Sequence, residues 1–203
     1  MSATRLLVLG VVRMHGAANG YQVRRELLTW SVDKWANVQP GSVYHALKQM
    51  TKEGLLEQAD IEPRGTGPDR TGYRLTPDGE REFQVLLANM ISEPGDSALD
   101  AFGLPAALTF LTTLPRDRAI GLLNHRLTQL DGQHATMASM LEHGSGWGQP
   151  EHVNELYRLW CATIDATAQW VRDLIKRLEA GDYVMADDTP DHFGGPPGVI
   201  KLD

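Results

Sequence analysis

The sequence has little cysteine and no long apolar run, and both absences limit what the chain can be. Cys161 is the single cysteine among 203 residues, so no disulfide can form within the chain and nothing indicates an oxidising compartment. No run of 18 or more apolar residues occurs, which argues against a membrane-spanning helix. The apolar N-terminus lacks a convincing cleavage site and fits a buried amphipathic helix better than a signal peptide. We therefore expect a cytoplasmic protein.

The residue patterns that usually carry catalysis are also missing. Cys161 has no histidine beside it in the sequence, and neither a Gly-rich phosphate loop nor a pair of acids stands out. Four histidines recur every nine residues, at His125, His134, His143 and His152. Nine residues are two and a half helical turns, so successive members face opposite sides and cannot converge on one ion. We expect no enzymatic activity, no cofactor and no metal site.

An excess of positive charge is absent as well, since the formal net charge is −7. The acidity is unevenly distributed. Residues 1–90 carry 11 Lys and Arg against 10 Asp and Glu, a balance of +1, whereas residues 91–203 carry 8 against 16, a balance of −8. The N-terminal half can therefore concentrate its positive charge on one face, and the overall charge does not exclude nucleic acid as a partner.

A short helix that begins at Pro40 is the most informative feature that the sequence does contain. Helices are also expected over residues 5–14 and 21–30, with residues 32–37 as a connector. Proline suits the first position of a helix, whereas Gln39 is a poor cap for it. Val43, Leu47 and Met50 fall at i, i+4 and i+7 and predict a core-facing stripe. Gly54 suits the left-handed residue that ends a helix.

Two strands are expected to follow, over residues 55–61 and 71–75. Residues 62–70 between them are rich in glycine and proline and predict a turn flanked by arginines. Thr76, Pro77 and Asp78 then form a strong helix start, because a capping hydroxyl precedes a proline and an acid. Helix, glycine, strand, basic turn and strand is the order of a winged helix-turn-helix.

This order makes duplex DNA the leading candidate ligand. The major groove admits one helix, whose exposed N-terminal side faces the base edges. Arginines of the turn could reach a phosphate or the minor groove. The candidate DNA-binding residues are Tyr21, Gln39, Ser42, Tyr44, His45, Lys48, Arg64 and Arg70. The alternative is that the helix presents an ordinary solvated surface.

Two long helices are expected in the C-terminal half, over residues 117–143 and 151–180. Apolar residues recur there in steps of three and four, which is typical of coiled-coil seams. We favour pairing between protomers of a homodimer over a helical hairpin within one chain. The candidate dimerisation residues are Leu123, Leu127, Leu130, Met137, Trp160, Ile164 and Val171.

Tryptophans suggest a small-molecule site where the two long helices meet the rest of the chain. Ligand pockets favour aromatic walls, so Trp35, Trp160 and Trp170 are candidate effector-binding residues near a helix over residues 104–114. The alternative is that they fill a core or an interface. In the tail, Asp187, Asp188, Asp191 and His192 are expected to be solvated.

Residues 7–87 resemble the winged-helix domain of PadR-type transcriptional regulators. The resemblance rests on Gly20-Tyr21, Trp35, Pro40-Gly41-Ser42-Val43-Tyr44, Ala46-Leu47, Glu53-Gly54-Leu55-Leu56, Arg70, Tyr73-Arg74-Leu75-Thr76 and Gly79. The two long helices, with Trp170, are similar to the dimer-forming C-terminal domain of one PadR branch. His45 stands where the family often has proline, and Gln39 where it often has serine. The resemblance implies a transcriptional regulator, usually a repressor released by a small molecule.

The sequence thus predicts a mainly α protein with a β-hairpin wing. We divide it into a winged helix-turn-helix over residues 1–91, a helical dimerisation and effector domain over residues 92–182, and a poorly ordered tail over residues 183–203. The expected function is that of a homodimeric repressor that binds a palindromic operator in double-stranded DNA. The alternative is a winged-helix adaptor that binds proteins and not DNA.

Overall fold

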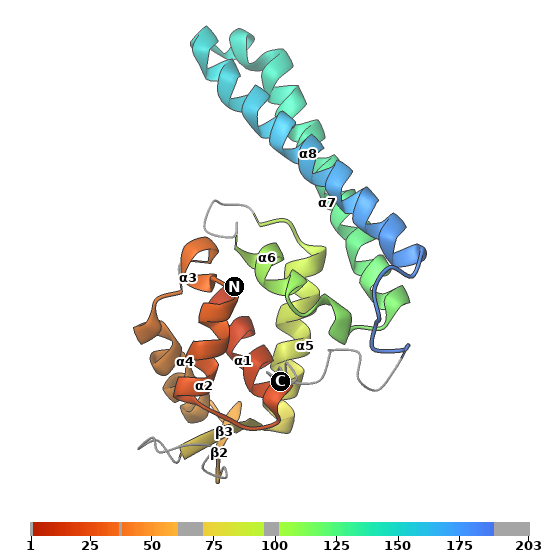
Figure 1. Ribbon diagram of the computed structural model, residues 1–203. Coiled ribbons are helices and arrows are strands. Elements are labelled where there is room, and N and C mark those ends of the chain that lie inside the picture. Colours follow the sequence, from red (N-terminus) through yellow and green to blue (C-terminus); the bar gives the residue numbers. More distant parts are fainter. Residues whose placement is uncertain (1, 37, 61–70, 96–101, 189–203) are drawn as a thin grey trace.

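The computed structural model describes residues 2–36, 38–60, 71–95 and 102–188 (Figure 1). The N-terminal elements are α1 (Ala3–His15), β1 (Ala18–Asn19), α2 (Gly20–Thr29), α3 (Val32–Trp35), α4 (Pro40–Lys52), β2 (Leu56–Asp60), β3 (Thr71–Leu75) and α5 (Pro77–Ser92). The C-terminal elements are α6 (Gly103–Leu108), the 3-10 helix η2 (Leu111–Thr113), α7 (Arg116–His143), the 3-10 helices η3 (Gly144–Trp147) and η4 (Glu151–Val153), and α8 (Asn154–Glu179).

The architecture confirms the predicted fold class, a winged helix-turn-helix followed by long C-terminal helices. Two details differ from the prediction. Residues 32–37 contain the short helix α3 where a plain connector was expected. The sheet has a third strand, β1, which pairs with β3 through Ala18 and Tyr73, in the order β1-β3-β2. Within the described ranges, no helix is long and apolar enough to cross a membrane.

Helix α1 lies at the centre of the core. Every residue from Leu6 to Val12 is buried, so the helix is covered on all sides. It contacts α2, α4 and α5 of the winged helix as well as α6 of the C-terminal half. A Cβ atom on Gly10 would collide with the ring of Phe110, which in turn packs edge-on against Phe83 at 5.5 Å. Glycine is therefore needed where the Phe110 ring meets α1.

The base of the wing is fixed to the start of α5. The Thr76 amide donates to the Leu55 carbonyl at 3.1 Å, and the Thr76 hydroxyl donates to the Gly54 carbonyl at 2.7 Å. The same hydroxyl accepts from the Gly79 amide at 3.1 Å, as the predicted cap requires. A Cβ atom on Gly79 would collide with the Leu55 carbonyl oxygen. Close backbone contact thus holds β2, β3 and α5 together.

The other end of α5 is capped by a side chain from α7. Arg126 is buried, and its guanidinium donates at 3.1 Å to the carbonyls of Met90, Ile91 and Glu93. The last carbonyls of a helix have no partner within it, so Arg126 satisfies groups that burial would otherwise leave unpaired. Burial lowers the pKa of Arg126 to about 10, which still leaves the side chain charged at neutral pH. Its charge also suits the negative end of the α5 dipole.

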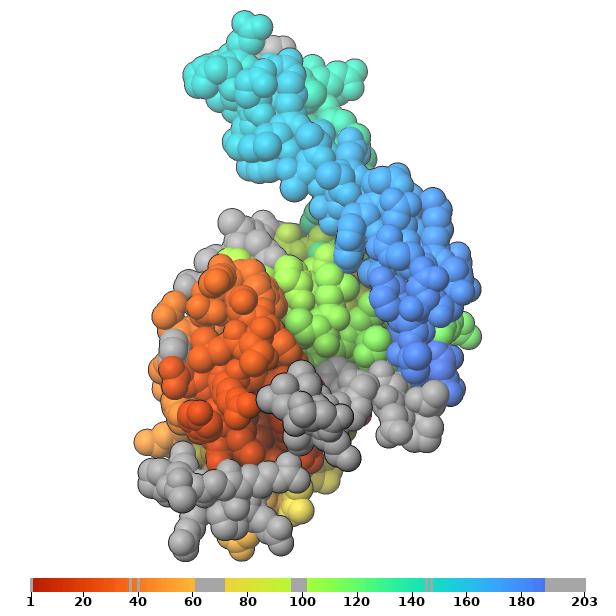
Figure 2. Space-filling view, in the orientation of Figure 1, coloured from red at the N-terminus to blue at the C-terminus, as the bar shows by residue number. Residues whose placement is uncertain are grey.

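Helices α7 and α8 pack on each other as a hairpin within one chain, and the outer half of the hairpin projects beyond the rest of the molecule (Figure 1 and Figure 2). Near the body the hairpin has buried residues, including Leu123 and Leu130 of α7 and Val171 of α8. Farther out the burial ends. All of residues 131–143 of α7 and 154–167 of α8 lie in the described part, and none is buried. The outer half therefore has no closed core of its own.

The chain turns back after α8 and is tied to the start of α7. The Asp187 carboxylate accepts from the Arg116 amide at 3.0 Å, and the Arg116 guanidinium pairs with Asp188. Met185 is fully buried. Asp187 and Asp188 are exposed to solvent, as expected, and they also bind Arg116, which the sequence did not predict. Asp191 and His192 lie outside the described residues, and the predicted division into three parts remains a prediction.

Gly79→Ala should destabilise the protein by about 1–3 kcal/mol, because an added methyl group must push the Leu55 carbonyl away. Gly132→Ala is the matched control. A Cβ atom there would meet nothing within 4 Å in the described structure. Because alanine suits a helix interior better than glycine, the free energy of unfolding should rise by roughly 0.5–1 kcal/mol. Urea denaturation of both variants measures the difference. A Gly79→Ala protein as stable as the wild type would contradict the close contact.

Arg126→Met should lower the free energy of unfolding by about 2–4 kcal/mol, because it leaves the α5 carbonyls without a donor in a buried site. Arg118→Met, which changes an exposed arginine of α7, should stay within about 0.5 kcal/mol of the wild type. Hydrogen exchange provides a second measurement, since amides near the end of α5 should lose protection only in the Arg126 variant. Equal effects of the two substitutions would show that Arg126 has no capping role.

Candidate nucleic-acid interface

Helix α4 presents one buried and one exposed face, as its sequence predicts. It begins at Pro40, and the Gln39 side chain makes no capping hydrogen bond. The stripe of Val43, Leu47 and Met50 is buried against α1 and α2. The opposite face is exposed and carries Ser42, Tyr44, His45, Lys48, Gln49 and Lys52. The apolar stripe thus fixes which side chains of α4 can reach a ligand.

Tyr21 and Tyr44 border this face where α2 begins. Tyr21 is 56% exposed and Tyr44 43%. A Cβ atom on Gly20 would lie only 2.5 Å from Cε1 of Tyr44, so glycine allows the tyrosine to lie across the start of α2. The same helix start has a capping box, in which the Gln22 amide donates to Asn19 Oδ1 at 2.8 Å. The helix that supports both tyrosines is therefore well anchored.

The positive charges of the N-terminal half are not equally available. Salt bridges join Arg5 to Glu53 at 2.7 Å, Arg13 to Glu80 at 2.9 Å and Arg74 to Glu57 at 2.7 Å. Hydrogen bonds from Gln49 and then from Arg5 lower the pKa of Glu53, which keeps this acid ionised. In contrast, no carboxylate of the described residues pairs with Lys48 or Lys52. Among the described residues of the N-terminal half, the exposed cations without a carboxylate partner are Arg25 of α2, Lys34 of α3, and Lys48 and Lys52 of α4, so two of the four lie on the exposed face of α4.

A shallow groove of about 500 Å³ runs beside α4, which the sequence did not indicate. One wall comes from Ser42 and His45 of α4, and the other from Ser2, Thr4 and Arg5 at the start of α1. The sequence alone does not reveal this groove, because it forms only where α1 and α4 pack together. The first turn of α1 therefore extends the surface around His45.

The wing stands beside this surface as an antiparallel hairpin. Strands β2 and β3 pair from Leu56 with Leu75 to Asp60 with Thr71. The predicted contact residues Arg64 and Arg70 lie outside the described residues. The remaining DNA candidates lie on or beside α4, namely Tyr21, Gln39, Ser42, Tyr44, His45 and Lys48. Their role in binding stays a prediction.

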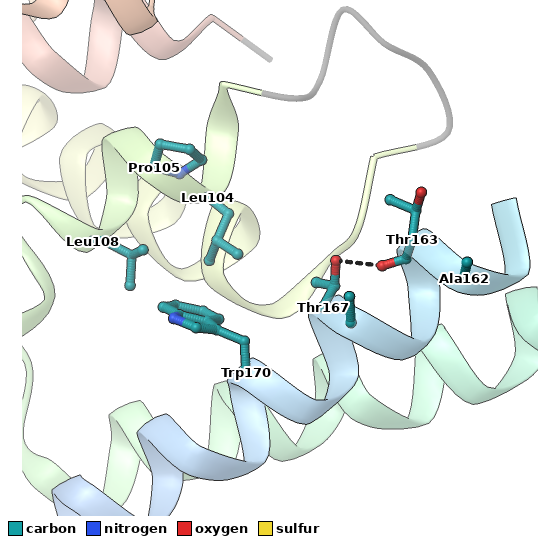
Figure 3. A pocket seen from close by; sticks show the side chains of 8 residues that line it. Leu104, Pro105, Leu108, Ala162, Thr163, Thr167 and Trp170 are labelled. Carbon is teal, nitrogen blue, oxygen red and sulfur yellow. Dashed lines mark hydrogen bonds between the residues drawn. The ribbon is translucent and has the colours of Figure 1, made fainter. Parts of the chain in front are cut away.

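The three tryptophans proposed for an effector site are not brought together. Trp35 packs against the N-terminal core, where its indole donates to the Trp30 carbonyl at 2.8 Å. Trp170 lines an apolar groove of about 620 Å³ between α8 and α6 (Figure 3). Its ring lies across from Leu104 and Leu108, whereas Trp160 lies outside the groove. The groove agrees with the predicted vicinity of residues 104–114, but only one of the three tryptophans forms it.

The candidate dimerisation residues differ in how far they are buried. Leu123, Leu130 and Val171 are buried within the single chain, while Leu127, Met137 and Ile164 are half-buried and Trp160 is 41% exposed. His134, predicted to interrupt the seam, lies 3.5 Å from an oxygen of Asp165. No group of three or more metal-ligating side chains occurs within the described ranges.

Comparisons with known proteins find a family similarity in the N-terminal part. Residues 8–85 match the sequence model of the family described as Transcriptional regulator PadR-like family. Among curated proteins no significant match is found. The chain is similar to the crystal structure of Bacillus subtilis PadR in complex with operator DNA, with 20% identity, a TM-score of 0.40, and coverage of 88% of this chain and 98% of that one.

Two further structures are similar to a comparable degree. The complex of Bacillus subtilis PadR with p-coumaric acid has 18% identity, a TM-score of 0.37, and coverage of 87% of this chain and 99% of that one. The PadR-like regulator BC1756 from Bacillus cereus has 16% identity, a TM-score of 0.35, and coverage of 88% and 99%. These whole-chain similarities are loose. The match to the PadR-like family model spans the winged helix-turn-helix, from within α1 to within α5.

Proposed function

We propose that this protein is a homodimeric repressor that binds an operator in duplex DNA and is released by a small molecule. The observation that carries the DNA-binding part is the exposed face of α4. Its side chains are polar or basic, its lysines are unpaired among the described residues, and the wing stands beside it. The PadR-like match over residues 8–85 supports the same assignment.

The geometry of α4 suits insertion into a major groove. A groove about 12 Å wide admits one helix, whose N-terminal residues face the base edges. Ser42 and His45 lie in the first two turns, where a hydroxyl and an imidazole can donate or accept hydrogen bonds. Tyr21 and Lys48 lie to the sides of that stripe, where phosphates would pass. We assign base readout to Ser42 and His45 and backbone contacts to Tyr21, Tyr44 and Lys48, with Gln39 at the helix entrance.

The acidic C-terminal half does not prevent DNA from approaching the exposed face of α4. The outer part of the α7–α8 hairpin and the wing lie at opposite ends of the molecule (Figure 1). At physiological ionic strength, charges more than about 8 Å apart in solvent are largely screened from one another. The local charge on α4 therefore outweighs the net charge of −7 in the encounter with DNA.

The outer half of the hairpin supports the homodimer. Leu156 and Leu159 of α8 are 43% and 61% exposed, and Trp160 lies close to them on the same helix. Large apolar side chains left exposed together mark interaction sites. A two-fold dimer would present two copies of α4 to half-sites about 34–36 Å apart, which agrees with a palindromic operator.

The release by a small molecule rests on the apolar groove beside Trp170. An aromatic wall and a volume of about 620 Å³ suit a small organic ligand. The groove adjoins α6, which contacts α1 and α5 of the winged helix. A ligand there would press on the elements that position α4.

Gel-shift titrations test the DNA-binding part. Lys48→Ala should weaken all duplexes alike and reduce the slope of log K against log salt by about 1, because it removes one phosphate contact. His45→Ala should cost about 1–3 kcal/mol on the operator and little on other sequences, because it removes base readout. Lys176→Ala, an exposed lysine of α8, is the charge control and should bind as the wild type. Binding to DNA phosphates is far tighter at 50 mM salt than at 200 mM. If the protein retards no duplex even at 50 mM salt, the adaptor alternative is favoured.

Sedimentation of the full chain tests the homodimer. The protein should sediment as a dimer at micromolar concentration, since the exposed apolar side chains of α8 are then covered by a partner. The dimer should persist without DNA. A monomer throughout the micromolar range would refute the proposed assembly and leave the DNA-binding part standing.

A further inference from the structure

The groove between α1 and α4 has a polar lining. Its volume is about 500 Å³, and Ser2, Thr4 and Arg5 form its α1 wall. The α4 wall consists of Gly41, Ser42, His45, Ala46, Gln49 and Met50. Hydroxyls, an imidazole, an amide and a guanidinium therefore surround this groove, whereas the groove beside Trp170 is apolar. Such a lining suits a polar or charged ligand.

Four of the lining side chains have no hydrogen-bond partner among the described residues, namely Ser2, Thr4, Ser42 and His45. A threonine within a helix can donate to the carbonyl four residues earlier, as Thr51 does to Leu47 at 2.8 Å. Thr4 lies in the first turn of α1, so no helical carbonyl precedes it at that distance. Its hydroxyl is therefore free to donate to a ligand.

Ser2 has no structural task of its own in the described part of the chain. It precedes α1 as the N-cap residue, yet its side chain makes no capping hydrogen bond. A capping serine stabilises a helix by accepting from one of its first amides, and this contact is not made here. Ser2 and Thr4 thus place two unpaired hydroxyls on the wall opposite Ser42 and His45.

Arg5 holds the two walls of the groove together. It is the only Lys, Arg, Asp or Glu among the described lining residues. Its guanidinium lies 2.7 Å from Glu53 at the end of α4 and 3.4 Å from Glu82 of α5. Two carboxylates offset its single charge, so Arg5 positions α1 against α4 and adds little free charge. The donors that remain available are the hydroxyls and the imidazole.

The groove lies on one flank of the helix that is proposed to enter DNA. Ser42 and Gln49 lie on the side of α4 toward α1, and Tyr44 lies over the start of α2. His45 falls between these two sides. A helix with its side chains is about 10–12 Å wide and the major groove about 12 Å, so both sugar-phosphate strands pass close beside the helix. One strand then passes α2, and the other passes the start of α1.

We propose that the groove between α1 and α4 binds a phosphate of the DNA strand that passes α1, through the hydroxyls of Ser2 and Thr4. This inference rests on the proposed DNA binding and gives α1 a direct contact with the backbone. Serine and threonine hydroxyls are common donors to DNA phosphates. His45 then reads a base while α1 holds the backbone beside it. Because a hydroxyl carries no charge, this contact adds affinity without the release of a counterion.

Gel-shift titrations of Thr4→Val in the full-length protein test this contact. The probes are a duplex that the wild-type protein selects from a random library and an unrelated duplex of equal length. Affinity for both should fall alike, by roughly tenfold, because a hydrogen bond to a charged group is lost. The slope of log K against log salt should stay unchanged, whereas Lys48→Ala lowers it by about 1. Thr4→Ser, which keeps the hydroxyl, should bind as the wild type.

Two further variants separate the contact from a general effect of losing a hydroxyl. Ser2→Ala should weaken both duplexes in the same way as Thr4→Val, although it removes no capping hydrogen bond. Thr136→Val is the matched control on α7, where the exposed hydroxyl donates to the Gly132 carbonyl at 3.0 Å. It should bind both duplexes as the wild type does. Circular dichroism should show all variants folded.

The outcomes separate this inference from the proposed function. A wild-type protein that retards no duplex even at 50 mM salt overturns both, since phosphate contacts are tight there. If the wild type binds DNA and Thr4→Val and Ser2→Ala bind equally well, DNA binding stands and the α1 contact is refuted. A loss confined to the selected duplex, or one that comes with a smaller salt slope, also refutes it, because an uncharged phosphate contact predicts neither.

A free phosphate ion would satisfy the same hydroxyls, and phosphorus-31 NMR of inorganic phosphate distinguishes it from the DNA backbone. Line broadening by the wild type that disappears in Thr4→Val, together with unchanged duplex affinity, would show that the groove holds the free ion and would overturn the proposal. A loss of duplex affinity at constant salt slope supports the proposal whether or not the free ion binds.

Discussion

The all-round burial of α1 is the constraint on which the rest of the structure depends. A helix that is apolar on every side must be covered on every side, and neither half of the chain can do this alone. The winged helix covers part of α1, and α6 with Phe110 covers the side at Gly10. The placement of α4 and of the α7–α8 hairpin follows from this shared core, since both are attached to elements that pack around α1.

The surfaces proposed for binding are those where this packing leaves charged or apolar side chains without partners. Arg5, Arg13 and Arg74 are neutralised by nearby acids, whereas Lys48 and Lys52 of α4 have no carboxylate partner among the described residues. On α8 the large apolar side chains Leu156, Leu159, Trp160 and Trp170 stay exposed. The exposed face of α4 is the surface proposed above for DNA, and the exposed side chains of α8 support the proposed homodimer. Their locations on different helices allow each to change without disturbing the other.

Local signals in the sequence predicted the winged helix well, because spacing and capping chemistry decide it. The stripe of α4, the glycine at Gly54 and the cap at Thr76 lie where they were expected. Features that depend on distant contacts were missed, among them the two-residue strand β1 and the capping of α5 by Arg126. The seam of α8 is reproduced only in its inner half, for a different reason. Steps of three and four can be drawn through either of two adjacent faces, and only the position of α7 separates Val171 from Trp170.

The capping of α5 at both ends has a mechanical consequence. Sixteen helical residues form a rod about 24 Å long, fixed to the wing by Thr76 at one end and to α7 by Arg126 at the other. A stiff rod held at both ends transmits rotation with little loss. In the homodimer proposed above, a change in the angle between the two hairpins would thus be carried by α5 to the wings and would alter the distance between the two copies of α4.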